Sequence, residues 1–179
     1  HALDLSLASI DEAVRQIRAI VHNLREPDSD VGLVERIRRE SSLSRSFLGF
    51  APSLLISVDG QSVNEQKECE DHRVELLNSR VDDSRSDDAV AIVREGLSNI
   101  ARHAHATAGA VNVELQGSGK TGRLTVSVSD DGIGIDPAHT RNSGLANMAE
   151  RARLNGGTFT VGTGLEGKGT KITWSVPLA

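Results

Sequence analysis

Aromatic side chains are scarce in this sequence of 179 residues, which has three phenylalanines, one tryptophan and no tyrosine. A platform that stacks the bases of single-stranded nucleic acid needs several aromatic rings, so the composition argues against one. A core with so few rings must be built from Val, Ile, Leu and Ala, and the 37% content of hydrophobic residues is enough for a globular domain.

The sequence also has only one cysteine, no excess of basic charge and no long apolar run. Cys69 is the only cysteine, which excludes an intrachain disulfide and a cysteine-rich zinc site and fits a reducing cytoplasm. The formal net charge of -5 argues against a nucleic-acid partner and against direct contact with a membrane surface. No apolar run approaches the ~20 residues that span a bilayer, so we expect a cytoplasmic chain, with any membrane anchor of the parent protein outside it.

The chain opens with a helical pattern. Apolar residues at steps of three and four predict a helix over residues 3–25 with one apolar face. They are Ile10, Val14, Ile17, Val21 and Leu24. Pro27 ends this helix. Because a short helix with one apolar face is not stable alone in water, it needs a partner helix or a second copy of itself.

The next part of the chain is less regular. Residues 31–44 are predicted to form a second helix and residues 53–58 a strand. Residues 59–86 are polar and charged with no clear period, which predicts a long loop or insertion.

From Asp88 onward the pattern is regular. Helices are predicted over 89–104 and 143–156, and strands over 109–115, 122–131, 157–163 and 169–178. This order predicts an α+β fold: a two-layer α/β sandwich with helices on one face of a mixed sheet and the other face largely solvated.

The first candidate motif is "REGLSNIARHA", in which Glu95 and Asn99 share one helix face and Arg102 and His103 follow one turn later. An amide oxygen is a hard ligand for magnesium, an arginine binds phosphate, and a carboxylate can orient a nucleophile. The alternative is the exposed polar stripe of an ordinary amphipathic helix.

The second motif is "SDDGIGID", in which Asp130 ends a strand and Gly132 and Gly134 follow. Glycines permit positive φ and close backbone approach to a flat ligand, and a carboxylate can accept a hydrogen bond from an exocyclic amine such as that of adenine. The alternative is a simple Asp-Asp-Gly turn.

Two further motifs contain glycine. Gly144 begins a helix that Asn142 or Ser143 can cap, and a helix N-terminus can bind phosphate; the alternative is an ordinary capped helix. The stretch "GLEGKGTKITWSV" places Gly164, Gly167 and Gly169 before a strand, where the alternative is a glycine-rich hairpin turn.

In this order, the motifs resemble those of the GHKL-type ATPases, which have the Bergerat fold and include sensor histidine kinases, DNA gyrase, Hsp90 and MutL. "REGLSNIARHA" resembles the N box, "DDGIGI" the G1 box and "GKGT" the G2 box. "GLANMAERARLNGG" and "VRQIRAIVHNLRE" are similar to histidine kinases of the NarX, DesK and DevS/DosS type. The resemblance covers residues 10–26 and 88–179 and is thin between them.

The resemblance implies a domain division and a set of roles. Residues 1–26 would be a partial dimerisation helix, the C-terminal part of the dimerisation and phosphotransfer region, and residues 27–179 the ATP-binding catalytic domain. Asn99 would hold the Mg²⁺ of Mg–ATP, and Glu95 would be the catalytic residue that polarises the attacking histidine. Arg102 would face the phosphates. The other expected contacts to ATP are His103 beside the nucleotide, Asp130 at the adenine amine, Gly132 and Gly134 around the pocket, Gly144 and Leu145 near the phosphates, and Gly167, Gly169 and Thr170 on the adenine side.

The implied activity is transfer of the ATP γ-phosphate to a histidine, followed by relay to the receiver domain of a response regulator. The implied partners are that domain and the chain's own dimerisation helix in a homodimer. None of the six histidines is followed by Asp or Glu, as the family's substrate histidine is. We therefore expect this chain to bind ATP and Mg²⁺ without phosphorylating itself, and we expect a short mobile lid over residues 136–143.

Other interpretations compete with the kinase. The chain could be a GHKL ATPase module of a chaperone or topoisomerase, although those carry longer lids and further domains. It could be a nucleotide-binding regulatory domain without kinase activity, or a non-catalytic interaction module that keeps the fold but has lost nucleotide binding; Glu95, Asn99, Asp130 and "GKGT" argue against the latter. It could also be an anti-sigma serine kinase, which would not begin with a dimerisation helix.

Overall fold

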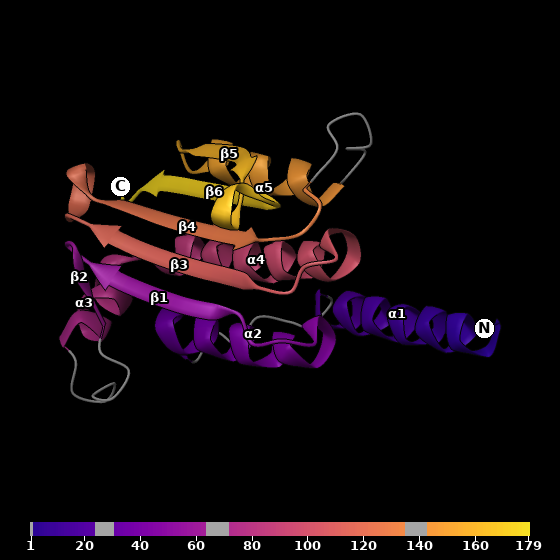
Figure 1. Ribbon diagram of the computed structural model, residues 1–179. Helices are drawn as coiled ribbons and strands as arrows, with labels where there is room; N and C mark the ends of the chain where they lie inside the picture. The colour runs from indigo at the N-terminus through magenta and orange to yellow at the C-terminus, as the bar shows by residue number, and fades with distance from the viewer. Residues whose placement is uncertain (1, 24–30, 64–71, 135–142) are drawn as a thin grey trace.

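The computed structural model describes residues 2–23, 31–63, 72–134 and 143–179. Within them one mixed sheet has the strand order β2-β1-β3-β4-β6-β5 (Figure 1). The strands are β1 (Ser53–Val58), β2 (Gln61–Ser62), β3 (Gly109–Gln116), β4 (Arg123–Asp130), β5 (Thr158–Thr163) and β6 (Thr170–Pro177). Strand β1 runs parallel to β3, and the other pairs are antiparallel.

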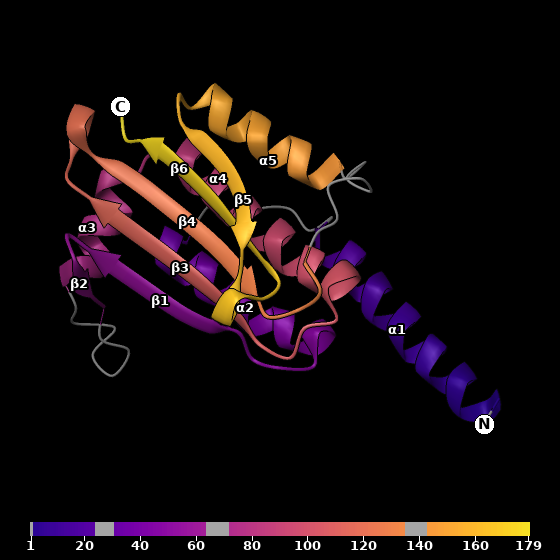
Figure 2. The same cartoon turned by 45° about the horizontal axis from the view of Figure 1, so that its top comes forward.

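Helices α2, α4 and α5 cover one face of this sheet, and α1 extends away from it (Figures 1 and 2). The helices are α1 (Ala2–Asn23), α2 (Leu33–Leu48), α3 (His72–Arg80), α4 (Asp83–Asn99) and α5 (Ser143–Leu154). Short helical turns follow or connect them: the π-helical η2 (Ile100–Ala104), η3 (Gly119–Thr121) and η5 (Leu165–Gly167). The predicted α+β sandwich, with helices on one face of a mixed sheet, is confirmed.

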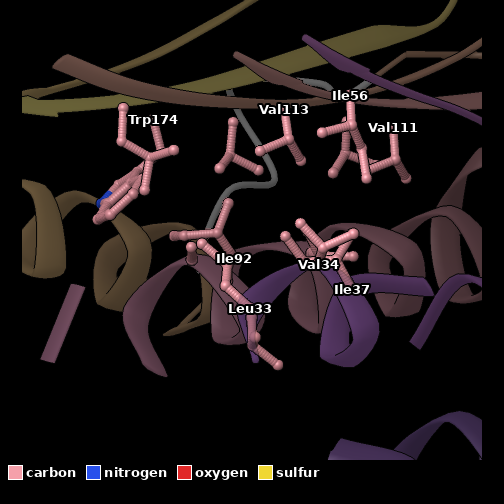
Figure 3. Close-up of a cluster of buried hydrophobic side chains, with 14 of the residues drawn as sticks. Leu33, Val34, Ile37, Ile56, Ile92, Val111, Val113 and Trp174 are labelled. Atoms are coloured by element: carbon pink, nitrogen blue, oxygen red, sulfur yellow. The ribbon is translucent and has the colours of Figure 1, made fainter. Parts of the chain in front are cut away.

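The core lies between the sheet and the helices because the strands alternate apolar and polar residues. Figure 3 shows Val111, Val113 and Trp174 of the sheet facing Val34 and Ile92 of the helices. All five side chains are at most 2% exposed. On the opposite face the register aligns polar residues across the sheet: Thr160, Thr173, Ser127 and Asn112.

The prediction of a long loop over residues 59–86 is wrong in part. Residues 61–62 form β2, residues 72–80 form α3, and α4 begins at Asp83 instead of near Asp88. Helix α3 buries only Leu77 completely, so its apolar period is too short to stand out in a polar stretch. The first turn of α4 is polar, but Asp82 caps it by accepting a hydrogen bond from the Arg85 N–H at 2.8 Å. Residues 64–71 lie outside the described part.

Helix α2 is longer than predicted and ends at Gly49, which has a φ of 81° and donates its N–H to the Arg45 carbonyl. Helix α1 agrees with the predicted helix over its described residues. Its C-terminal half contacts α2, where Arg18 Nη1 donates to the Ser46 carbonyl at 3.3 Å. No helix of the described residues is both long and apolar enough to span a membrane.

Candidate functional site

Helix α4 and the π-turn after it place three predicted site residues together. Arg102 Nη2 donates to Glu95 Oε1 at 2.9 Å and to Asn99 Oδ1 at 3.0 Å. The spacing of four and three residues puts all three side chains on one helix face. Asn99 is 8% exposed, and the side chains of Glu95 and Arg102 are 22% and 25% exposed. This cluster is therefore half-buried, with a cation held between a carboxylate and an amide oxygen.

The guanidinium of Arg102 is incompletely satisfied in this cluster. Its Nε–H is buried and finds no acceptor among the described residues. A buried N–H without an acceptor is unfavourable, so the group can gain from an anionic ligand with several oxygens.

His103 belongs to the same π-helical turn, but its side chain lies outside the described part of the chain. The turn ends at His105, which has a left-handed conformation with a φ of 48°. Single π-turns within helices are often found at functional sites.

Asp130 ends β4 and points its carboxylate into a nearly closed environment, because the residue is only 4% exposed. The Gly132 N–H donates to Asp130 Oδ1 at 2.8 Å. Burial raises the pKa of the Asp130 carboxyl above its usual value of 3.8, and hydrogen bonds from the backbone of Gly132 and Thr170 oppose that rise. A carboxylate has about four lone-pair sites, so Asp130 can accept a further hydrogen bond from a ligand amine beside those two bonds.

Two glycines, Gly164 and Gly169, pack directly against Asp130, and Gly134 packs against Gly169. A Cβ on Gly169 would lie 2.4 Å from Asp130 Oδ1, and one on Gly164 would lie 2.1 Å from the Asp130 carbonyl oxygen. Gly134, with a φ of 80°, faces the Gly169 carbonyl. Gly132 takes part through its N–H; its φ is not in the positive region. The structure therefore brings the D-x-G-x-G and G-x-G-T elements together, and we call the residues Asp130, Gly132, Gly134, Gly164, Gly169 and Thr170 the cradle.

Thr170 completes the cradle, since it is 7% exposed and begins β6 beside the end of β4. Gly167 lies apart from it. Gly167 is exposed in η5, and no atom of the described residues is within 4 Å of its Cβ position. Its positive φ of 76° fits a tight turn, which is the alternative interpretation of this motif.

The cradle and the Arg102 cluster lie at the same end of the sheet. A Cβ on Gly96 of α4 would contact Val128 of β4 at 2.9 Å, so helix and strand pack closely there. One turn later, Ile100 Cδ1 lies 3.5 Å from the Cβ position of Gly109, and Gly109 is the register partner of Asp130. Asn99 and Asp130 therefore lie at the same end of the sheet, one in the helix layer and the other in the sheet layer.

Asp131 is a residue that the sequence reasoning passed over. Its carboxylate accepts hydrogen bonds from the Thr107 N–H at 2.9 Å, the Thr107 hydroxyl at 2.7 Å and the Ala108 N–H at 2.9 Å. The Thr107 hydroxyl, followed by the two N–H groups, lowers the pKa of Asp131. Asp131 thus ties the chain after the π-turn to the loop that starts at Asp130, and the doubled Asp was the available signal.

Helix α5 carries the predicted Gly144 and Leu145. Gly144 is buried, and Leu145 packs against the core. Near the C-terminal end of α5, Arg151 pairs with Asp88 of α4, and Asn155 Nδ2 donates to Asp88 at 2.7 Å. Figure 2 shows α5 running opposite to α4, so the end with Gly144 points toward the end of α4 that carries Asn99. The predicted lid lies outside the described residues, apart from Ser143.

The side chains present fit a magnesium–nucleotide. Asn99 already offers its amide oxygen to a cation, as a magnesium ligand must, and Arg102 has a buried N–H available for an anion. Gly164 and Gly169 pack so closely on Asp130 that a Cβ on either glycine would clash with it. The individual roles expected for these residues remain predictions.

Comparison with known proteins shows similarity to one ATPase family and to histidine kinases. Residues 84–179 match the family described as "Histidine kinase-, DNA gyrase B-, and HSP90-like ATPase". The histidine-protein kinase/phosphatase UhpB of Salmonella typhimurium is 39% identical over 87 residues, which are 48% of this chain and 16% of UhpB. The sensor histidine kinase LiaS of Bacillus subtilis is 28% identical over 168 residues, which are 84% of this chain and 45% of LiaS.

A solved structure also shares the fold. The histidine kinase domain of the blue-light activated histidine kinase from Erythrobacter litoralis EL346 has a TM-score of 0.54 and 20% identity, over 93% of this chain and 75% of that domain. The chain spans less than half the length of UhpB and LiaS.

Proposed function

This chain belongs to the family of histidine kinase-, DNA gyrase B- and HSP90-like ATPases, and from that membership we propose that it is the ATP-binding catalytic domain of a two-component sensor histidine kinase. The observation that carries the proposal is the placement of Asp130 and Asn99 at one end of the sheet, on opposite layers. A ligand that reaches both must have an amine at one end and metal-bound oxygens at the other, as Mg–ATP does.

In this proposal Asp130 reads the adenine by accepting a hydrogen bond from its exocyclic amine. The glycines beside it let the flat base approach the backbone, and Gly144 offers the N-terminal end of α5 to the phosphates. Asn99 supplies an amide oxygen to Mg²⁺, which when bound neutralises charge on the phosphates. His103, Gly132, Gly134, Leu145, Gly167, Gly169 and Thr170 complete the proposed contacts.

Glu95 is the proposed catalytic residue. Phosphoryl transfer forms an N–P bond to the histidine and breaks the bond between the γ-phosphorus and the ADP oxygen. Catalysis of such a transfer rests on positioning and charge stabilisation. Glu95 can orient the imidazole by accepting its N–H, which aims the opposite nitrogen at the γ-phosphorus. In this proposal the histidine comes from another helical segment, because none of the chain's six histidines is followed by Asp or Glu.

Helix α1 supports the finer proposal that the chain is of the NarX, DesK and DevS/DosS type, with a receiver domain as the acceptor of the phosphoryl group. Ile10, Val14, Ile17 and Ile20 follow one another at helical steps and are 39–59% exposed. Such a stripe is expected where a second helix of the dimerisation region packs.

The experiment that tests the proposal is a calorimetric titration with ATP, ADP and GTP, each with Mg²⁺ or with EDTA. Wild type should bind the adenine nucleotides, more tightly with Mg²⁺, and reject GTP. Asp130→Ala should lose the preference for adenine. Glu114→Gln, on the opposite face of the sheet, serves as the matched control. Unchanged ATP affinity in Asp130→Ala would refute the assigned role.

The kinase step needs a second assay. A dimerisation segment that carries the histidine should become labelled from γ-labelled ATP when this chain is added, and Glu95→Gln should bind ATP yet label it far more slowly. Incorporation of label into this chain alone would overturn the expectation that it does not phosphorylate itself.

A further inference from the structure

Both hydrogens of one arginine nitrogen are already in use. Arg102 Nη2 gives one N–H to Glu95 Oε1 and the other to Asn99 Oδ1, at 2.9 and 3.0 Å. A primary guanidinium nitrogen has only two hydrogens, so this nitrogen has none left for a phosphate. In this arrangement the arginine holds the two residues that the proposed function needs for the metal and for the histidine.

The metal and the guanidinium need the same oxygen. Asn99 has a single side-chain oxygen, and a magnesium ligand lies about 2.0–2.1 Å from the ion. A magnesium ion on Asn99 Oδ1 would therefore stand a few ångströms from the positive Nη2, and two cations at that distance repel strongly in a half-buried site. The amide oxygen has two lone pairs, so the competition is electrostatic: a metal on Asn99 Oδ1 would weaken the present bond from Arg102 by repelling the guanidinium.

The Nε–H of Arg102 favours movement of the guanidinium away from Asn99. The Arg102 Nε–H is buried without an acceptor among the described residues, so the present arrangement leaves one donor unsatisfied. Phosphate oxygens can accept two parallel N–H groups from the guanidinium fork, including Nε. Movement toward phosphates would therefore satisfy a donor that the present contacts leave unsatisfied.

The residue type at position 99 fits an exchange. A hydrogen bond from Arg102 to a neutral amide is weaker than an ion pair with a carboxylate at the same place. An aspartate there would hold the guanidinium more firmly and add a second anion beside Glu95. The amide holds the arginine in place but lets a divalent cation replace it.

From these contacts we propose that Arg102 is a positioning residue that keeps Asn99 and Glu95 oriented in the nucleotide-free domain and gives up its bond to Asn99 when magnesium–nucleotide binds. The inference rests on the proposed function for the metal, but its first half concerns the nucleotide-free chain alone. In this role the guanidinium supplies a positive charge at Asn99 Oδ1 before the metal binds there, and so keeps both side chains oriented.

The first test uses the sign of a stability change in the nucleotide-free chain. Asn99→Asp should raise the unfolding midpoint of the wild-type chain, since the new carboxylate would form an ion pair with Arg102. In the Arg102→Met background the same change should lower the midpoint, since the new carboxylate would lie near Glu95 after the positive charge of Arg102 has been removed. A merely structural arginine elsewhere would not reverse the sign, so Arg123→Met, on the opposite face of the sheet, is the matched control.

A second measurement follows the release directly. The ¹⁵N resonance of the Arg102 Nε–H, assigned by its loss in Arg102→Met, should shift when Mg²⁺ and ADP are added together and shift less with ADP in EDTA. Far-UV circular dichroism of each variant establishes that it is folded before the comparison is made.

The outcomes of these measurements distinguish failure of the proposal about Arg102 from failure of the proposed function. Destabilisation by Asn99→Asp to the same extent in both backgrounds overturns the positioning role, whatever the chain binds. An Arg102 resonance unchanged at saturating Mg–ADP overturns the release. Failure of the wild type to bind ADP in either buffer refutes the proposed function and leaves the stability result to decide the positioning role by itself.

Discussion

Gly169 lies so close to Asp130 that a Cβ on the glycine would stand 2.3 Å from the Asp130 carbonyl oxygen and 2.4 Å from its carboxylate. Gly169→Ala must therefore displace Asp130 and also adopt an unfavourable φ of 65°. We expect a loss of about 2–4 kcal/mol of unfolding free energy and of measurable ATP binding. Urea unfolding and calorimetry measure both. Gly119→Ala has a similar φ of 57° and no atom within 4 Å, so it should cost about 1–2 kcal/mol and leave ATP binding intact. Equal effects of the two substitutions would contradict the close-contact argument.

The charge of Asp130 should lower the unfolding free energy of the chain but strengthen ATP binding. Its pKa is raised by burial, so the fold favours the protonated form and the cost of the charge appears as pH rises above 3.8. Asp130→Asn should therefore stabilise the nucleotide-free chain at pH 7 and have little effect at low pH. It should also weaken ATP binding about ten- to a hundred-fold, the usual effect of losing a charged acceptor. Denaturant unfolding between pH 3 and pH 7 checks the sign, and a variant less stable than wild type at pH 7 would contradict it.

Asp131 should act in the opposite direction. Its pKa is lowered by the Thr107 hydroxyl and by two backbone N–H groups, so it stabilises the fold above the unfolded value of 3.8 and loses that effect as pH falls further. Asp131→Asn should be less stable than wild type at pH 6, and the difference should vanish in acid. Thr107→Val should show part of the same loss, because it removes one of the three donors. A constant difference at all pH values would count against this assignment.

The ion pair between Glu40 of α2 and Arg94 of α4 is nearly buried, with the side chains 8% and 12% exposed and 2.7 Å apart. Glu40→Gln should cost about 3–5 kcal/mol because it removes the anion from a nearly buried pair, whereas replacing both residues by methionine should recover most of that loss. Thermal or urea unfolding of the single and double variants tests this. Glu150→Gln, in an exposed pair with Arg153, should change stability little. A double variant as unstable as the single one would show that the pair itself is needed.

The exposed stripe of α1 should be an association surface. Ile17 is 59% exposed at its centre, so Ile17→Glu should abolish self-association of the chain if a second copy covers this face. Light scattering after gel filtration measures the mass. Leu154→Glu, on α5 and 69% exposed, is the control that should leave the mass unchanged. A monomeric wild type at all concentrations would remove the second copy as the partner.

By itself the sequence determined the elements with strong periods and the residue types of the site. The alternation around Val111 and Val126 predicts strands, and the steps from Val93 to Leu97 and Ile100 predict a helix, because burial of one face requires these periods. The order of the motifs was enough to identify the family. The polar stretch before Asp88 was interpreted as loop because α3 buries only Leu77 and because a capped polar first turn has no apolar period.

Only the tertiary structure decided how distant segments meet. The approach of Gly164 and Gly169 to Asp130 depends on the pairing of β4 with β6, and pairing is set by packing across the sheet. The two hydrogen bonds from Arg102 to Glu95 and Asn99 need side-chain rotamers and burial that the spacing of these residues in the sequence does not specify. The three donors that converge on Asp131 come from a turn whose position depends on how the end of η2 lies against the sheet edge.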